Sequence, residues 1–198
     1  MLKRLISGIT ASAFTLSLAT VAIPATVFAT APTVTHITDC DGLQAMGDGL
    51  SGSYVLDNNI DCSASDFEPV GAFMFMPFTG SFDGHGHTIS GLHINSNGAG
   101  VGLFGGTNGA TISNVGILGA DITGDDYVGA LVGFAVNTDI SNAYSSGSVT
   151  ANGPYDVGGL IGVDLGGTQT GLSSSAQVSG YNDVGGLAGA ITNTTLSN

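Results

Sequence analysis

The side chains of this sequence that could do chemistry are carboxylates that lie in turns. Asp156 and Asp183 each precede the first valine of a recurring motif, and Asp125 and Asp126 lie in the turn one motif earlier. Carboxylates stacked on neighbouring turns repel one another, and a bound Ca²⁺ would relieve that repulsion. The alternative is that each aspartate is exposed and accepts hydrogen bonds from nearby backbone amides.

Paired carboxylates also permit a second kind of chemistry. Glycosidases use two carboxyl groups separated by roughly 5 to 9.5 Å, and stacked aspartates can meet that distance. A carbohydrate-binding or carbohydrate-cleaving site is therefore an alternative to a calcium site. The sequence has no Trp to stack against sugars, which disfavours the cleaving activity.

The segment "DGHGHT" contains the second candidate site. His85 and His87 are two residues apart, and Asp83 has the same parity, so a strand would place all three on one face. Imidazole and carboxylate groups in this arrangement can bind a divalent metal. The alternative is a glycine-rich turn with solvated imidazoles.

Other reaction classes lack the residues they need. The zinc-protease helix with two His, the nucleophile elbow and the phosphate loop ending in Lys are all missing from the sequence. The only glutamate, Glu68, has no histidine near it. We therefore predict a protein without enzymatic activity and without a resident cofactor, Ca²⁺ being the one metal the carboxylates favour.

The distribution of charge predicts export. The formal net charge is −13, and the two basic residues, Lys3 and Arg4, precede an uncharged apolar run that reaches Ala29. A short basic start, an apolar stretch and a small-residue exit are typical of a secretory signal peptide, here residues 1–29. A membrane anchor is the alternative, which Pro24 in mid-run disfavours.

Without residues 1–29 the chain has no Lys or Arg, so its formal charge falls to −15. Nucleic acids and anionic lipids are bound by cationic side chains, so neither is an expected partner, and no membrane insertion of the mature chain is expected. We expect a secreted or cell-surface protein whose ligand is extracellular, a host or matrix glycan or protein.

Cys40 and Cys62 are the only cysteines of the chain. In an exported chain such thiols are usually oxidised, which favours a disulfide over two free buried thiols. A zinc site is disfavoured because the histidines are not at finger spacing.

The elements that position these groups repeat along the chain. Four strings, "VGLFG", "VGALVG", "VGGLIG" and "VGGLAG", recur in order at nearly equal intervals. Short strands separated by polar turns cannot bury a face alone, so successive periods must stack. We therefore predict an all-β fold, a right-handed parallel β-helix (β-solenoid) with about 27–29 residues per coil. The recurring positions of the motif are Leu103, Leu131, Leu160 and Leu187, which form an interior stack, and Gly105, Gly133, Gly162 and Gly189, which serve corners and close backbone approaches.

A second element recurs in phase. Nine residues after three of these leucines come Ile112, Ile140 and Leu196, whereas the third copy has Gln169. Two residues further on, Asn114, Asn142 and Asn198 should form a side-chain ladder that breaks at Gly171. Within the motif two large residues are adjacent, so we expect a bend with the leucine inward and the following residue in a more variable environment.

The remaining segments complete the domain organisation. Residues 30–92 are the predicted N-terminal capping region with the first strands and a brief helix near 42–46, begun by an aspartate N-cap. Residues 93–198 are the predicted repeats. They end in mid-coil, so we expect a truncated chain whose uncapped C-terminal coil self-associates.

The motifs resemble a known bacterial family. "VGGLIG" and "VGGLAG" are similar to the GLUG motif of secreted and surface proteins, among them immunoglobulin A1 proteases and large adhesins. "YVLDNNIDC", "FTGSFDGHGHTISGL" and "VGLFG" are similar to the segment that precedes GLUG repeats, so the resemblance spans about residues 54–198. It implies a parallel β-helix outside the cytoplasm. It does not imply protease activity, because the repeats accompany the catalytic domain.

Overall fold

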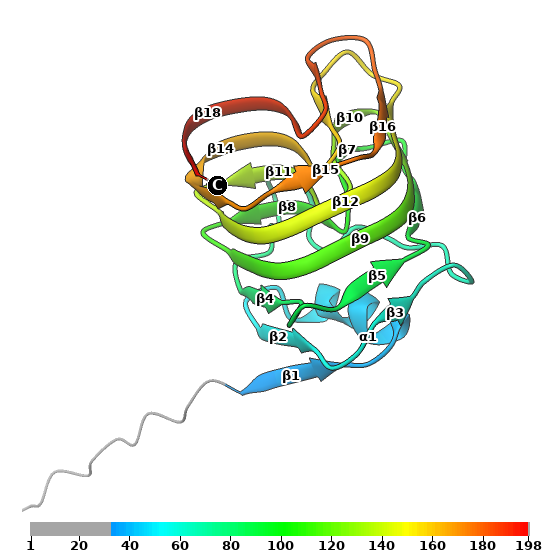
Figure 1. Cartoon of the computed structure of the whole chain (residues 1–198), viewed down its shortest axis with the longest axis vertical. Coiled ribbons are helices and arrows are strands. Elements are labelled where there is room, and N and C mark those ends of the chain that lie inside the picture. Colours follow the sequence, from blue (N-terminus) through cyan, green and yellow to red (C-terminus); the bar gives the residue numbers. More distant parts are fainter. Residues whose placement is uncertain (1–32, 198) are drawn as a thin grey trace, which may run out of the picture. The chain divides into compact units, whose positions relative to one another are not determined.

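The computed structural model describes residues 33–197 (Figure 1). The predicted signal peptide, residues 1–29, and the last rung of the predicted asparagine ladder, Asn198, lie outside the described residues. Among those residues no helix has the length and apolar character needed to cross a membrane.

The predicted parallel β-helix is confirmed, since every pairing between named strands is parallel and joins one coil to the next. Figure 1 shows β9, β12 and β14 as long curved ribbons lying side by side. The elements are β1 (Val34–Ile37), α1 (Cys40–Gln44), η1 (Ala45–Asp48), β2 (Ser53–Leu56), β3 (Ile60–Asp61), β4 (Ser81–Asp83), β5 (Thr88–Ser90), β6 (His93–Asn95), β7 (Ala99–Val101), β8 (Phe104–Asn108), β9 (Thr111–Gly124), β10 (Asp126–Val128), β11 (Val132–Val136), β12 (Asp139–Ala151), β13 (Val157–Gly158), β14 (Ile161–Thr170), β15 (Ser173–Ser174), β16 (Gln177–Ser179), β17 (Val184–Gly185) and β18 (Ala188–Ser197).

The register of the strands follows the sequence period. Phe104 pairs with Val132, Val132 with Ile161, and Ile161 with Ala188, so each residue that follows a motif leucine lies on its counterpart in the next coil. A separate sheet of four short strands, in the order β17-β13-β10-β7, carries the valines that open the motifs. Each motif therefore connects one strand of this small sheet to one strand of the large sheet.

The core consists of inward-facing side chains stacked in rows. Leu103, Leu131 and Leu160 are completely buried, and Leu187 packs against them in the last coil. A second row pairs Phe82 with Ile112, Ile112 with Ile140, Ile140 with Gln169, and Gln169 with Leu196. Stacking of like aliphatic residues is thus interrupted at Gln169, the position where the sequence departs from its repeat.

The chain bends inside the motif, as predicted, between β10 and β11 and at the equivalent place in other coils. The expectation of a variable environment after the leucine is wrong for three copies, because Phe104, Val132 and Ile161 are buried like the leucines. The reversal of the chain at the bend lets two adjacent side chains face the same core.

The last glycine of the motif lies where two backbones meet. A Cβ atom on Gly162 would lie 2.6 Å from the carbonyl carbon of Tyr127 and would overlap the carbonyl oxygen of Gly133. Real Cβ atoms essentially never come this close to backbone. The glycine is therefore required by packing between the small sheet and the large sheet, and by no special φ angle.

The asparagine ladder forms on the described coils. Asn142 Nδ2 donates to Asn114 Oδ1 at 2.9 Å, and Asn114 Nδ2 donates to Asp83 Oδ1 at 3.0 Å. Both asparagines have positive φ, of 52° and 54°, and Gly171 keeps the same left-handed backbone with a φ of 62°. The ladder stops at Gly171 because glycine has no side-chain amide to form the next rung.

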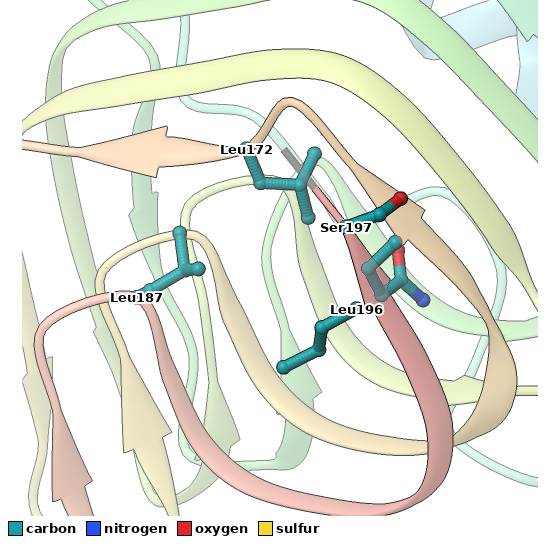
Figure 2. A pocket seen from close by; sticks show the side chains of 5 residues that line it. Leu172, Leu187, Leu196 and Ser197 are labelled. Atoms are coloured by element: carbon teal, nitrogen blue, oxygen red, sulfur yellow. The ribbon is translucent and has the colours of Figure 1, made fainter.

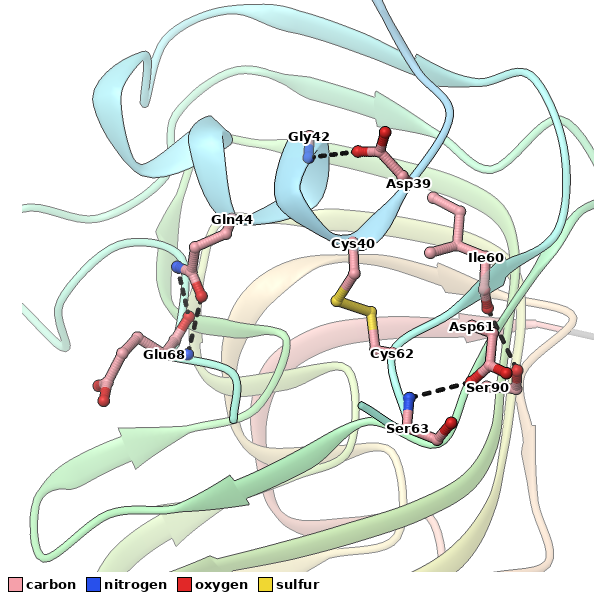
Figure 3. The surroundings of a disulfide bond; sticks show 10 residues. All are labelled: Asp39, Cys40, Gly42, Gln44, Ile60, Asp61, Cys62, Ser63, Glu68 and Ser90. Carbon is pink, nitrogen blue, oxygen red and sulfur yellow. Dashed lines mark hydrogen bonds between the residues drawn. A yellow bond between two sulfur atoms is a disulfide. The ribbon is translucent and has the colours of Figure 1, made fainter. Parts of the chain in front are cut away.

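The N-terminal end of the β-helix carries the helix and the disulfide (Figure 3). Asp39 caps α1 by accepting from the Gly42 amide at 2.8 Å, and Cys40 is bonded to Cys62 with the two Cα atoms 5.3 Å apart. Parallel pairing already begins between β1 and β2 and continues through β4 to β9. The stacked coils thus extend into residues 30–92.

Candidate functional site

The turn carboxylates lie at the starts of strands of the small sheet, because each of them directly precedes or begins one of these strands. Val157 pairs with Val184, so Asp156 and Asp183 occupy equivalent places on successive coils, as predicted. The earlier coil departs from this pattern. Val128 pairs with Val157, which places Tyr127 in register with Asp156, leaves Asp125 in the bend before β10 and makes Asp126 the first residue of that strand. The four aspartates therefore do not form one continuous row.

Asp156 and Asp183 interact with one another. Burial raises the pKa of Asp156, and the charge of Asp183 and a hydrogen bond shared with it raise that pKa further. Asp126 behaves differently, because its Oδ1 is buried against the turn and has no hydrogen-bond partner among the described residues. The pair at Asp156 and Asp183 can share a proton, which is a means of lowering like-charge repulsion without a metal.

No group of three or more His, Cys, Asp or Glu side chains in residues 33–197 is arranged to hold a metal ion. Ca²⁺ prefers six to eight oxygen ligands. Asp156 and Asp183 alone would have to be completed by backbone carbonyls and water.

The histidine segment forms a turn. His85 has a positive φ of 53°, and its backbone amide donates to Asp83 Oδ1 at 2.8 Å. The same Asp83 oxygen accepts from Asn114, while His87 Nδ1 lies 3.2 Å from Asn59 Oδ1. The rings of His85 and His87 are perpendicular with centroids 6.1 Å apart. Asp83 is thus hydrogen-bonded within the turn and to the asparagine ladder. The side chains of Asp83, His85 and His87 do not converge on a common metal position.

A row of aromatic rings lies beside the turn carboxylates and was not predicted from the sequence. The Phe73 and Tyr127 rings are stacked with centroids 5.2 Å apart, and the Tyr127 and Tyr155 rings are stacked at the same distance. Phe134 packs edge-on against Phe73 and Tyr127. Tyr155 is 50% exposed, and Tyr181 on the next coil is 77% exposed. Tyr127 has a left-handed backbone, with a φ of 54°.

The loop that contributes Phe73 is apolar and projects from the coils. Ala72 and Met76 form a small antiparallel bridge, so residues 72–76 make a hairpin. In this hairpin Met74, Phe75 and Met76 are 61%, 89% and 63% exposed. A groove of about 350 Å³ lies between this hairpin and the outer side of β8 and β11.

Two polar residues are buried in the coil that follows the third motif. Asp164 and Gln169 are 0% and 1% exposed, and both oxygens of Asp164 and Oε1 of Gln169 have no hydrogen-bond partner among the described residues. Gln169 Nε2 donates to the carbonyl oxygen of Thr138 at 2.9 Å. Burial raises the pKa of Asp164 to about 6, while Thr194 and Gln169 act in the opposite direction.

A hollow of about 340 Å³ opens on the inner face of the last described coil (Figure 2). Leu172, Leu187 and Leu196 extend into it, and Leu196 is 56% exposed. The equivalent side chains of earlier coils are covered by the coil that follows.

A signal for the buried acid was present in the sequence. The residues four positions after the motif leucines are Thr107, Ala135, Asp164 and Ile191. Asp164 thus falls in a row of side chains that face the core, where burying a charged group would lower the stability of the fold. The tyrosines had a weaker signal. Tyr127, Tyr155 and Tyr181 stand about four, five and six positions before the leucine of their motif, so their spacing does not follow the period of the leucines.

Comparisons with known proteins agree with this architecture. The GLUG motif family matches residues 124–150, which comprise β10, β11 and most of β12, one complete passage around the coil. The copies "VGGLIG" and "VGGLAG" lie outside the matched residues, although β13 pairs in register with β10, and β17 pairs in register with β13.

A relative and a solved structure extend the match along the chain. Halomucin of Haloquadratum walsbyi (strain DSM 16790 / HBSQ001) is 37% identical over 154 residues, which are 70% of this chain and 2% of halomucin. The crystal structure of a putative immunoglobulin A1 protease from Bacteroides ovatus superposes with a TM-score of 0.57 at 18% identity, covering 82% of this chain and 66% of that one. This second likeness shows a shared fold. The chain thus carries a GLUG motif, at residues 124–150, within a parallel β-helix.

Proposed function

We propose that this chain is a non-enzymatic β-helix module of an exported surface protein, acting as a stiff spacer that displays adhesive side chains. The observation that carries the proposal is the uninterrupted parallel hydrogen bonding from β1 to β18, with inner rows in register. Such a stack resists bending, because each coil is bonded to its neighbours along its length.

The surface chemistry supports a display role. All 15 acidic residues lie in residues 33–198, and no Lys or Arg accompanies them. A high net charge of one sign keeps a protein soluble and discourages unspecific association. Among the described residues Asp156 and Asp183 belong to no group of three or more metal-ligating side chains, which disfavours metal-assisted hydrolysis.

The test combines location with activity. Intact cells that produce the protein are treated with an external protease, and the purified chain is incubated with panels of polysaccharides and peptides. The proposal expects the chain to be degraded from outside and to hydrolyse nothing. Hydrolysis that disappears in Asp156→Asn would contradict the non-enzymatic role, and protection from the external protease would contradict the surface location.

A second candidate function, binding of neutral glycans, is favoured by the aromatic row. Exposed rings at Tyr155 and Tyr181 offer surfaces for sugars, and Asp156 and Asp183 offer acceptors for sugar hydroxyl groups. Residues 33–197 contain no Lys or Arg, which disfavours sulfated or otherwise anionic glycans. Binding on a glycan array that is lost in Tyr155→Ala with Tyr181→Ala, and kept in Tyr144→Ala, supports this candidate. No binding by the wild type would dispose of it.

A further inference from the structure

The interior of the coil contains a carboxyl group that nothing in the described chain neutralises. Asp164 belongs to an inner row in which Phe78 pairs with Thr107, Thr107 with Ala135, Ala135 with Asp164, and Asp164 with Ile191. Phe78, Thr107 and Ala135 are at most 1% exposed. The acid therefore occupies a position that the preceding coils fill with small or apolar side chains.

No cation lies near enough to compensate a charge at this position. Several strands pack against β14. Strands β11, β13 and β18 carry no titratable residue. Strand β10 carries Asp126 and Tyr127, and strand β12 carries Asp139 and Tyr144. None of these four groups acts on Asp164, whose surroundings are set by burial and by the side chains of Thr194 and Gln169. The described residues contain no Lys or Arg, and their four histidines precede residue 94.

A buried carboxylate with no partner is far more costly than a neutral carboxyl group. The neutral form also has an O–H to donate. Gln169 Oε1 is a buried acceptor without a donor, and the Gln169 side chain is one of the two polar neighbours of Asp164. One proton on Asp164 would thus remove the uncompensated charge and convert one of the unpartnered acceptors into a donor.

We propose that Asp164 is a proton-binding site inside the β-helix, which is occupied in the folded chain at mildly acidic pH and shares its proton with Gln169. Strand β18 covers this site, with Ile191 directly opposite Asp164 and Thr194 beside it. Loss of the proton places a charge between β14 and β18. The attachment of the β18 coil is therefore weakened as the pH rises, and the coils on the N-terminal side of β14 are not.

The test compares Asp164→Asn with the wild type in urea unfolding from pH 5 to pH 8. Burial raises the acid's pKa to about 6 from 3.8, so the wild-type unfolding constant should increase about tenfold over this range relative to the variant. Glu68→Gln, at an exposed residue whose hydrogen bonds to Gln44 use only its backbone, removes the same charge and should behave as the wild type. Asp164→Ala, which repeats the Ala135 of the previous coil, is the second variant if the asparagine fails to fold.

A local measurement distinguishes this proposal from a general effect of charge. Amide hydrogen exchange, corrected for its intrinsic pH dependence, should accelerate at pH 8 in residues 188–197 of the wild type and not in Asp164→Asn or Asp164→Ala. Equal pH dependence in the wild type and both variants would overturn the proposal. So would protection of the wild type at pH 8 by Ca²⁺ or Na⁺ that both variants lack, since a cation would then be the occupant.

Discussion

Asn142 Nδ2 donates a hydrogen bond of 2.9 Å to Asn114 Oδ1 on the preceding coil, and both residues have a left-handed backbone. Asparagine is one of the few residues other than glycine that adopts this conformation readily. The pair therefore stabilises the turn in two ways, through its backbone preference and through a bond between coils. Gly171 has the backbone for a further rung and lacks the side chain.

Replacement of Gly171 by Asn should extend the ladder. A Cβ at this position lies 3.0 Å from Asn142 Oδ1, the far end of a side chain that can adjust. We expect Gly171→Asn to raise the free energy of unfolding by about 0.5–1 kcal/mol, from one hydrogen bond and a stiffer unfolded chain. Gly171→Ala is the control and should lower it by about 1 kcal/mol, because alanine is strained at positive φ. Urea denaturation of both variants decides the matter, and equal stability of the two would contradict the ladder.

Gly162, in the third copy of the motif, and Gly186, at another position of the fourth copy, should respond very differently to replacement by alanine. A Cβ on Gly162 would press on the backbone of Gly133 and Tyr127, whereas one on Gly186 meets nothing within 4 Å. We expect Gly162→Ala to destabilise by more than about 2 kcal/mol, as overpacking against backbone does. Gly186→Ala should be neutral or slightly stabilising. Thermal unfolding of the two variants is the measurement, and a neutral Gly162→Ala would disprove the close approach.

The carboxylate pair gives a pH-dependent prediction. The folded chain raises the pKa of Asp156 above its ordinary value of 3.8, so its protonated form is favoured by folding. The stability this provides is complete below pH 3.8 and is lost as the pH rises through the folded pKa. Asp183→Asn should remove the neighbouring charge and gain less than about 1 kcal/mol at pH 7, since the site is partly exposed.

The check on this prediction is the difference in melting temperature between Asp183→Asn and the wild type at pH 3, below the ordinary pKa of 3.8, and at pH 7. The difference should grow with pH, and Glu68→Gln, at an exposed residue outside the carboxylate pair, should show no such growth. A difference that is the same at both pH values would mean that the backbone preference of asparagine at this left-handed position, where φ is 41°, accounts for the whole effect.

The disulfide should be a large contributor to the stability of the N-terminal end. Cys40 and Cys62 close a loop with a sequence separation of 22, which corresponds to about 3 kcal/mol in the chain-entropy estimate. We expect the Cys40→Ala, Cys62→Ala double variant to lose about this amount in urea unfolding. Wild type treated with a reducing agent should unfold at the same urea concentration as the double variant. Unchanged unfolding of the reduced wild type would contradict the prediction.

Most of the fold could be predicted from the sequence because its information is periodic. Leucines that recur at a nearly constant interval must lie on one another if the periods stack, so the inner row from Leu103 to Leu187 follows from the period alone. The same reasoning located Gln169 in the row of Ile112 and Ile140. It failed for the burial of Phe104, Val132 and Ile161, because alternation on a flat strand does not describe two residues on either side of a reversal.

The candidate site was only partly predictable. Asp156 and Asp183 were correctly placed opposite one another, since both precede a motif valine by one residue. Asp125 and Asp126 were not, because their turn differs in length from the next and Tyr127 takes the equivalent place. Turn lengths determine which residues align at the surface, whereas the inner rows are held in register by packing and hydrogen bonds.

The sequence by itself determined the coil period, the inner aliphatic rows, the need for glycine in the motif and the absence of positive charge outside the first residues. Each of these is a property of residue type or spacing. Tertiary structure alone decided that Phe73 stacks on Tyr127, because the hairpin at 72–76 has no counterpart in the other coils and so no period to place it. It also decided that Asp164 is enclosed without a partner, since burial depends on what the next coil lays over a side chain.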